Sequence, residues 1–239
     1  MSQRYINSSE RILDDRGHAN LSYVSDTPVT KELVEGILKI TEITVKPGMG
    51  FLPHLHKGID LITIPLEGKL ERVNSTGESY VMERGTVNVL QTGWGIQHYE
   101  YNKSCSTELK CVELEFRNAK LTKPRNRLYV TDPKPNTIKR LLNCKRDDEN
   151  GSYGYSVLSV NLEAGSSKRF IKESESHEVV FYIIDGLIRI GEHLLLSGDT
   201  FVCNSDITCD VFCKTASHFI VAEIRRPRKS VDWGPFGVS

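Results

Sequence analysis

The sequence has no long apolar run, no net charge and no CxxC cysteine pair, and each absence excludes a class of protein. Its longest apolar stretches, such as residues 179–184, are far shorter than the roughly 20 residues that a membrane-spanning helix needs. The 31 lysine and arginine residues balance 31 aspartate and glutamate residues, which removes the global electrostatic case for nucleic acid or an acidic membrane as the main partner. The first residues carry neither an apolar signal core nor an arginine-rich amphipathic pattern, so we expect a cytoplasmic protein.

The six cysteines include no CxxC pair, and in a cytoplasmic chain of this size we expect them to be reduced and mostly buried. Cys203, Cys209 and Cys213 could be combined with His218 into a metal site, but their spacings match no familiar zinc pattern. A length of 239 residues with 26% charged residues indicates a globular protein of one large domain or two small ones.

Short apolar and β-branched segments separated by turn signals run through the whole chain, which is typical of an all-β protein. Residues 74–77 are expected to form a hairpin turn, and the one helix that we expect is a short one near residues 136–143. These segments predict a β-sandwich or a β-barrel. The expected strands are residues 37–45, 61–66, 69–73, 79–82, 87–90, 109–116, 155–162, 179–184, 187–190, 200–203, 208–213 and 219–224.

The order of turns and strands occurs twice along the chain, which is best explained by two similar β-domains. Between the two halves lies a polar stretch rich in Lys, Arg, Asn, Asp and Pro, as a linker would be. We therefore expect an N-terminal domain at residues 1–118, a linker with a short helix at 119–150 and a C-terminal domain at 151–239. The echoed turn glycines are Gly48 and Gly165, Gly68 and Gly186, and Gly85 and Gly198.

Four side chains in the first half have the types and spacing of a metal site. His54 and His56 are two residues apart, so on a strand both point to one face. His98 and Glu100 repeat this arrangement, with Tyr99 pointing the other way. One HxH pair arises by chance in about one chain in five of this composition, so the pair alone is weak support. Both pairs follow Gly-rich turns that allow close backbone approach, so strands that face each other could bring all four groups to one cation.

These motifs resemble the two cupin motifs and, more narrowly, the pirin family. Residues 51–60, 66–68 and 92–100 look like pirin sequences, and residues 16–20 resemble the bacterial quercetinase-like members of that family. The first cupin motif is matched by Gly48, His54, His56, Asp60 and Gly68, and the second by Gly85, Gln91, Gly93, Gly95, His98 and Asn102.

The resemblance implies a bicupin, an all-β protein of two jelly-roll-type β-barrels with metal in the N-terminal barrel only. It places the metal ligands on His54, His56, His98 and Glu100. It further implies Fe(II) as the first candidate for the metal, with Zn, Ni, Co, Mn or Cu as alternatives. Since Glu100 is the only carboxylate of the set, it is also our candidate for the catalytic general base.

The chain departs from the pirin pattern at several positions. Asp60 stands where glutamate is usual, but that position is not a ligand in pirins, so the metal site should survive. Leu55 replaces a common proline, and Trp94 could narrow the pocket mouth. The aromatic segment that usually follows residue 20 is absent. Trp94 and the missing aromatic segment bear on the substrate more than on the metal.

Several pirins open a flavonol ring with dioxygen, and others are described as transcriptional co-regulators or metal-dependent sensors. We therefore expect a metal-dependent dioxygenase of the quercetin 2,3-dioxygenase type, acting on an aromatic or enol substrate with O₂. One alternative is a non-catalytic metal-binding pirin that senses redox state or binds a protein partner. Another is a different cupin reaction, such as isomerisation of a sugar or keto compound. In each case we expect no direct nucleic-acid contact and no membrane.

Overall fold

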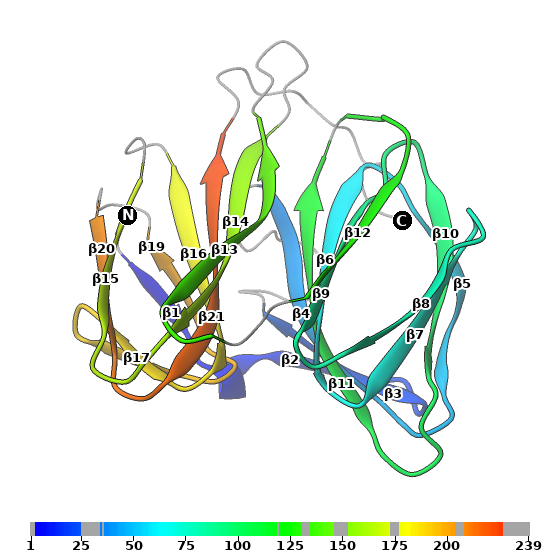
Figure 1. Ribbon diagram of the computed structural model, residues 1–239, viewed down its shortest axis with the longest axis horizontal. Coiled ribbons are helices and arrows are strands. Elements are labelled where there is room, and N and C mark those ends of the chain that lie inside the picture. The colour runs from blue at the N-terminus through cyan, green and yellow to red at the C-terminus, as the bar shows by residue number, and fades with distance from the viewer. Residues whose placement is uncertain are drawn as a thin grey trace. The chain divides into compact units, whose positions relative to one another are not determined.

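The computed structural model describes residues 3–24, 34, 36–118, 120–130, 134–145, 153–172, 177–203 and 208–226, whose regular secondary structure is almost entirely β-strand (Figure 1). The expected all-β class is therefore confirmed. Besides the strands there is one 3-10 turn, η1 (Ser8–Glu10). No helix in the described part of the chain is long and apolar enough to cross a membrane.

The chain divides into two compact units. One begins at Ile12 and takes in the rest of the first half, and the other combines the residues up to Arg11 with the second half. The N-terminal segment up to residue 11, which we expected in the first domain, therefore packs with the second, because β1 (Arg4–Ile6) pairs with a strand near residue 200.

The N-terminal unit is a barrel of two antiparallel sheets, with β5, β10, β7 and β8 forming one wall in Figure 1. The seven-stranded sheet has the order β12 (Arg125–Val130), β9 (Thr86–Gln91), β6 (Ile59–Glu67), β11 (Leu109–Arg117), β4 (Ile37–Val45), β3 (Ala19–Val24) and β2 (Ile12–Asp15). The four-stranded sheet has the order β5 (Gly50–His56), β10 (Ile96–Asn102), β7 (Lys69–Asn74) and β8 (Ser79–Glu83).

The C-terminal unit repeats this plan. Its six-stranded sheet has the order β1, β19 (Thr200–Cys203), β16 (Glu178–Asp185), β21 (Ser217–Arg225), β14 (Gly154–Leu162) and β13 (Thr137–Cys144). Its four-stranded sheet has the order β15 (Ser167–Ile171), β20 (Thr208–Cys213), β17 (Leu187–Ile190) and β18 (His193–Leu196).

The two units share one topology, which confirms the sequence repeat. The order β9-β6-β11-β4 in the first corresponds to β19-β16-β21-β14 in the second, and β5-β10-β7-β8 corresponds to β15-β20-β17-β18. The echoed glycines occupy equivalent turns: Gly68 and Gly186 have φ of 76° and 96°. A Cβ on either would lie within 3 Å of a neighbouring strand, so only glycine fits both turns.

The short helix expected near residues 136–143 is wrong, because these residues form strand β13. Ile138, Leu141 and Leu142 have helical spacing, but a β-bulge between Arg140 and Leu142 turns two consecutive leucines toward the core. The bulge therefore produces on a strand an apolar pattern that looks helical.

The expected linker at residues 119–150 also contains strand β12, which pairs with β9. Both β12 and β13 are edge strands of their sheets and keep many side chains in solvent, so their sequence is as polar as a linker. Residues 119, 131–133 and 146–150 of the expected linker lie outside the described residues.

The two barrels are filled differently. Phenylalanine rings dominate the core of the C-terminal barrel, where Phe181 lies with its ring centroid 5.5 Å from Phe170 and 6.5 Å from Phe219. In the N-terminal barrel Leu61 and Leu90 of the large sheet pack against Ile96 of the small one. Ile96 is the first residue of β10, which carries His98, so this small apolar cluster packs β10 against the large sheet.

Leu61→Ala should destabilise the protein by about 2–5 kcal/mol, because Leu61 is fully buried in the cluster that joins the two sheets. Urea unfolding of the full chain measures the loss. Leu13→Ala is the matched control: Leu13 is 79% exposed, so its truncation should change stability by less than about 0.5 kcal/mol. Equal effects of the two substitutions would contradict the assignment of this core.

Candidate metal site

Antiparallel pairing of β5 with β10 brings the two histidine-bearing segments together. In the register of this pair His98 lies opposite His54, and Ile96 lies opposite His56. The strands approach very closely where they begin to pair, since a Cβ on Gly50 would lie 2.1 Å from the carbonyl oxygen of Glu100. The glycine-rich turn before the first histidine pair is therefore required for this approach, as its sequence indicated.

The rings of His54, His56 and His98 form a compact triangle. Their centroids are 4.8 Å apart for His54 and His56, 4.5 Å for His54 and His98, and 4.7 Å for His56 and His98. Each offers one ring nitrogen to a common point, and the three nitrogens lie within 4.8 Å of one another. Among the described residues no other group of three His, Cys, Asp or Glu side chains is arranged in this way.

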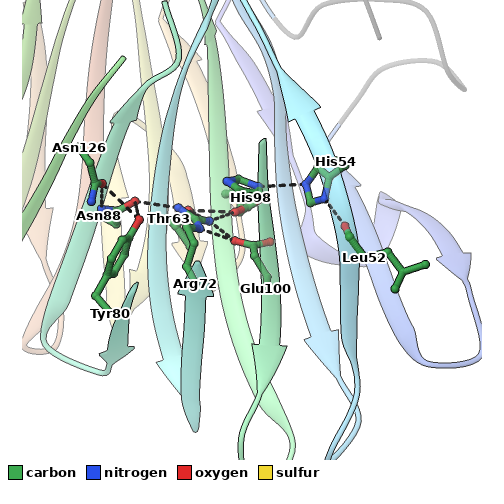
Figure 2. A network of polar contacts seen from close by, with 10 residues as sticks. Leu52, His54, Thr63, Arg72, Tyr80, Asn88, His98, Glu100 and Asn126 are labelled. Carbon is green, nitrogen blue, oxygen red and sulfur yellow. Dashed lines mark hydrogen bonds and ion pairs between the residues drawn. The ribbon is translucent and has the colours of Figure 1, made fainter. Parts of the chain in front are cut away.

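The spacing of these nitrogens fits a metal ion. The Nε2 atoms of His54 and His98 are 3.0 Å apart (Figure 2). Two nitrogens about 2.05 Å from one ion and at right angles to each other would be about 2.9 Å apart. The other nitrogen of His54, Nδ1, is 2.8 Å from the carbonyl oxygen of Leu52, to which it donates a proton, so Nε2 of His54 is left as the ligand atom.

Burial keeps two of the histidines neutral. Burial is the largest cause of a pKa of about 4 for His56 and about 2 for His98, and the positive charge of Arg72 contributes to lowering both, against the opposing effect of Glu100. Neutral imidazole is the form that binds a metal ion. The rings of His56 and His98 are therefore ready for binding at neutral pH without first losing a proton.

Glu100 lies beside the three histidines, with its carboxylate bound to Arg72. It is on the same inward face of β10 as His98, while Tyr99 between them is partly exposed, as the strand pattern predicted. Burial, the largest single influence, raises the pKa of Glu100, but the Arg72 guanidinium together with His98 and His54 outweighs burial and brings the pKa down to about 2. Glu100 is thus a carboxylate at neutral pH.

Arg72 is the main residue of this region that the sequence analysis missed. It is fully buried and binds Glu100 and Glu113, Asn88 and Thr63 (Figure 2). A signal for it was present, because β7 alternates exposed and buried positions and Arg72 falls between the buried Leu70 and Asn74. A cation at an inward position of a barrel strand indicates an anionic partner inside the barrel.

The other residues that the sequence analysis considered lie outside the histidine cluster. Asp60 is fully buried and accepts hydrogen bonds from Gln91 Nε2 at 3.0 Å and Asn118 Nδ2 at 2.9 Å, so it fixes a turn of the barrel. Cys209 and Phe170 face each other on β20 and β15, the strands equivalent to β10 and β5. These strands of the C-terminal barrel therefore bring an apolar pair together, whereas their equivalents in the first barrel carry the histidines.

The pKa of Glu113 is raised to about 8, first by burial and second by the charge of Glu100, against the opposing effect of Arg72. A folded-state pKa above the ordinary 4.5 means that Glu113 contributes stability below about pH 4.5 and loses this contribution as the pH rises to about 8. Glu113→Gln keeps the shape without the titration. The free energy of unfolding of the wild type should therefore fall relative to that of Glu113→Gln over this range. Urea unfolding of both metal-free proteins across the range measures the difference, and parallel pH profiles would contradict it.

Comparison with known proteins finds that these strands are similar to those of a recognised family. The Pirin family model matches residues 22–114. Quercetin 2,3-dioxygenase of Escherichia coli K12 is 27% identical over 113 residues, which cover 44% of this chain and 49% of that protein. A Pseudomonas aeruginosa protein provisionally named quercetin 2,3-dioxygenase is 38% identical over 138 residues, covering 54% of this chain and 58% of that protein. The chain thus aligns with about half the length of these relatives.

Solved structures show the same fold. The bacterial pirin YhhW of Escherichia coli in complex with nickel(II) superimposes with a TM-score of 0.83 at 16% identity, covering 95% of this chain and 100% of that one. A quercetin 2,3-dioxygenase of Acinetobacter baumannii superimposes with a TM-score of 0.69 at 13% identity, covering 98% and 90%. The expected bicupin fold is confirmed. The match to the Pirin family model covers β5 and β10 with all three histidines.

Proposed function

We propose that this chain binds one divalent transition-metal ion through His54, His56, His98 and Glu100 and acts as a dioxygenase of the quercetin 2,3-dioxygenase type. The observation that carries the proposal is the convergence of three ring nitrogens beside a buried carboxylate. The name of the Escherichia coli relative supports a flavonol, or a similar enol, as the substrate with O₂.

The donor set suits a first-row transition metal without selecting one. Three neutral imidazoles and one carboxylate leave a divalent site with a net charge of +1, and such mixed nitrogen and oxygen ligands suit Fe, Mn, Co, Ni, Cu or Zn. We take Fe(II) as the first candidate, because it can exchange electrons with dioxygen. When bound, the ion would supply Lewis acidity toward an enol oxygen and redox chemistry toward O₂.

The protein's own groups orient and enclose the site. The Leu52 carbonyl fixes the ring of His54, and burial of His98 and Glu100 limits access of water to one side of it. The second role expected for Glu100, that of general base, has less support. Arg72 engages one of its oxygens, and a pKa near 2 makes the carboxylate a weak base.

We also propose that the protein works in the cytoplasm. All six cysteines are free, and Cys111, Cys203, Cys209 and Cys213 are buried, as expected for reduced thiols that act as small apolar side chains. This arrangement suits a reducing compartment.

His56→Ala should abolish stoichiometric metal binding while the protein stays folded, because the substitution removes one ligand from a partly buried position outside the apolar core. Elemental analysis of the purified variant and circular dichroism measure the two properties. His18→Ala is the matched control: His18 belongs to the same barrel but packs against Phe51, outside the cluster, and should keep its metal. Unchanged metal content in His56→Ala would show that the ligands are assigned wrongly.

Metal-loaded protein should consume O₂ and bleach a flavonol such as quercetin, and His56→Ala should lose this activity. An oxygen electrode together with the visible absorbance of the flavonol measures the reaction, with an anaerobic sample as the control. Metal-loaded protein that leaves a panel of flavonoids unchanged in air would contradict the dioxygenase assignment. A metal-dependent protein partner would then support the non-catalytic alternative.

A further inference from the structure

The contacts of Arg72 with Glu100 are one-sided. The Nε atom of Arg72 donates to Oε1 of Glu100 at 2.8 Å, and Nη2 of Arg72 donates to the same oxygen. Both of these hydrogen bonds end on Oε1, and among the described residues neither contact of Arg72 reaches the other oxygen, Oε2. In Figure 2 the Glu100 carboxylate lies between Arg72 on one side and His54 on the other. Arg72 thus engages one oxygen of the carboxylate and leaves the other.

Arg72 itself has little freedom to move. Its side chain is completely buried, and Nη1 donates to Oδ1 of Asn88 at 2.7 Å. Nη2 donates to Thr63 Oγ1 at 2.8 Å and to Glu113 Oε1 at 2.9 Å. These partners belong to the large sheet, whereas Arg72 belongs to the small one. The guanidinium is therefore held in place from the opposite wall of the barrel.

We propose that Arg72 is a positioning residue that occupies Oε1 of Glu100, so that only Oε2 can bind a metal ion held by His54, His56 and His98. This proposal rests on the metal site proposed above and deepens it. A carboxylate can bind a metal ion through one oxygen or through both. Binding through both would break two charge-assisted hydrogen bonds to a buried guanidinium, which is strongly unfavourable.

The consequence is one more open position on the ion. Three nitrogens and one carboxylate oxygen leave two of six positions for water, substrate or dioxygen. If both oxygens of Glu100 were bound, only one position would be left. Arg72 thereby sets how many small molecules the site can accept at once.

A purely structural role for Arg72 makes different predictions. A buried arginine that only joins two sheets would, when replaced, lower the stability of the barrel and leave the ligands of the ion unchanged. A positioning role changes the number of waters on the ion. The test therefore needs a measurement of coordination in addition to one of stability.

The experiment uses Mn(II), whose effect on the relaxation rate of water protons is proportional to the number of waters bound to it. Full-length wild type and Arg72→Met are loaded with Mn(II) and compared per bound ion. We expect the relaxation enhancement of Arg72→Met to fall by about twofold, from two waters to one. The visible spectrum of the Co(II)-loaded proteins should change in parallel.

Two further variants separate the possible causes. Glu113→Gln also changes a partner of Arg72, on the opposite sheet, and should keep the wild-type enhancement and Co(II) spectrum. In a Glu100→Gln background, Arg72→Met should have no further effect on the enhancement, because the group that Arg72 positions is gone. Equal enhancement in wild type and Arg72→Met, or the same change in the Glu100→Gln background, would overturn the proposal.

A crystal structure of the Co(II)-loaded wild type gives the answer even if Arg72→Met does not fold. One Glu100 oxygen on the ion and the other on Arg72 would support the proposal, whereas both oxygens on the ion, or neither, would overturn it. The two proposals can also fail separately. A wild type that binds neither Mn(II) nor Co(II) overturns the metal site itself, whereas binding with an unchanged Arg72→Met variant overturns only the role of Arg72.

Discussion

The pairing of β5 with β10 is the constraint on which the candidate site depends. Because side chains alternate between the two faces of a strand, this one register sets His54 opposite His98 and keeps His56 on the same face. A slip by one residue would turn the histidines of one strand away from those of the other. The site is thus a property of strand register, which the small apolar cluster around Leu61 helps to maintain.

A comparison of equivalent strands in the two barrels shows that the histidine cluster depends on the side chains that the strands carry and not on the topology of the sheets. The topology of the sheets is the same, yet β15 and β20 bring Phe170 and Cys209 together where β5 and β10 bring histidines. The N-terminal barrel encloses the Arg72 guanidinium, which is buried and must be paired with a carboxylate such as that of Glu100. The C-terminal barrel encloses packed aromatic rings such as those of Phe170 and Phe181. One scaffold therefore holds a polar interior in one copy and an apolar one in the other.

The sequence predicted the features that follow from short-range periodicity. All twelve expected strands fall within strands of the structure, and the bounds of four of them, β4, β17, β19 and β20, agree to the residue. The sequence also predicted that His54, His56 and His98 converge, because residues two apart on a strand share a face and a second strand was expected to face the first. The edge strands β12 and β13 were taken for a linker because exposed strands carry polar residues on both faces.

The remaining features depend on contacts between residues far apart in the sequence. The Leu52 carbonyl that orients His54 is a backbone group, and no residue type marks its direction. The placement of Glu100 as a fourth ligand stays a prediction. The role of Arg72 in holding that carboxylate became visible only when the opposite sheet was in place, since Thr63, Asn88 and Glu113 come from three other strands.

Gly50 shows how such a site restricts substitution at positions that are not ligands. It binds nothing, yet any side chain there would collide with the backbone of Glu100 and force β5 away from β10. Selection on the histidines would therefore act on this glycine with equal severity. Tolerance to substitution along β5 should thus depend on the distance to β10 as well as on the distance to the histidines. A scan of variants should find Gly50 intolerant to substitution although it is not a ligand.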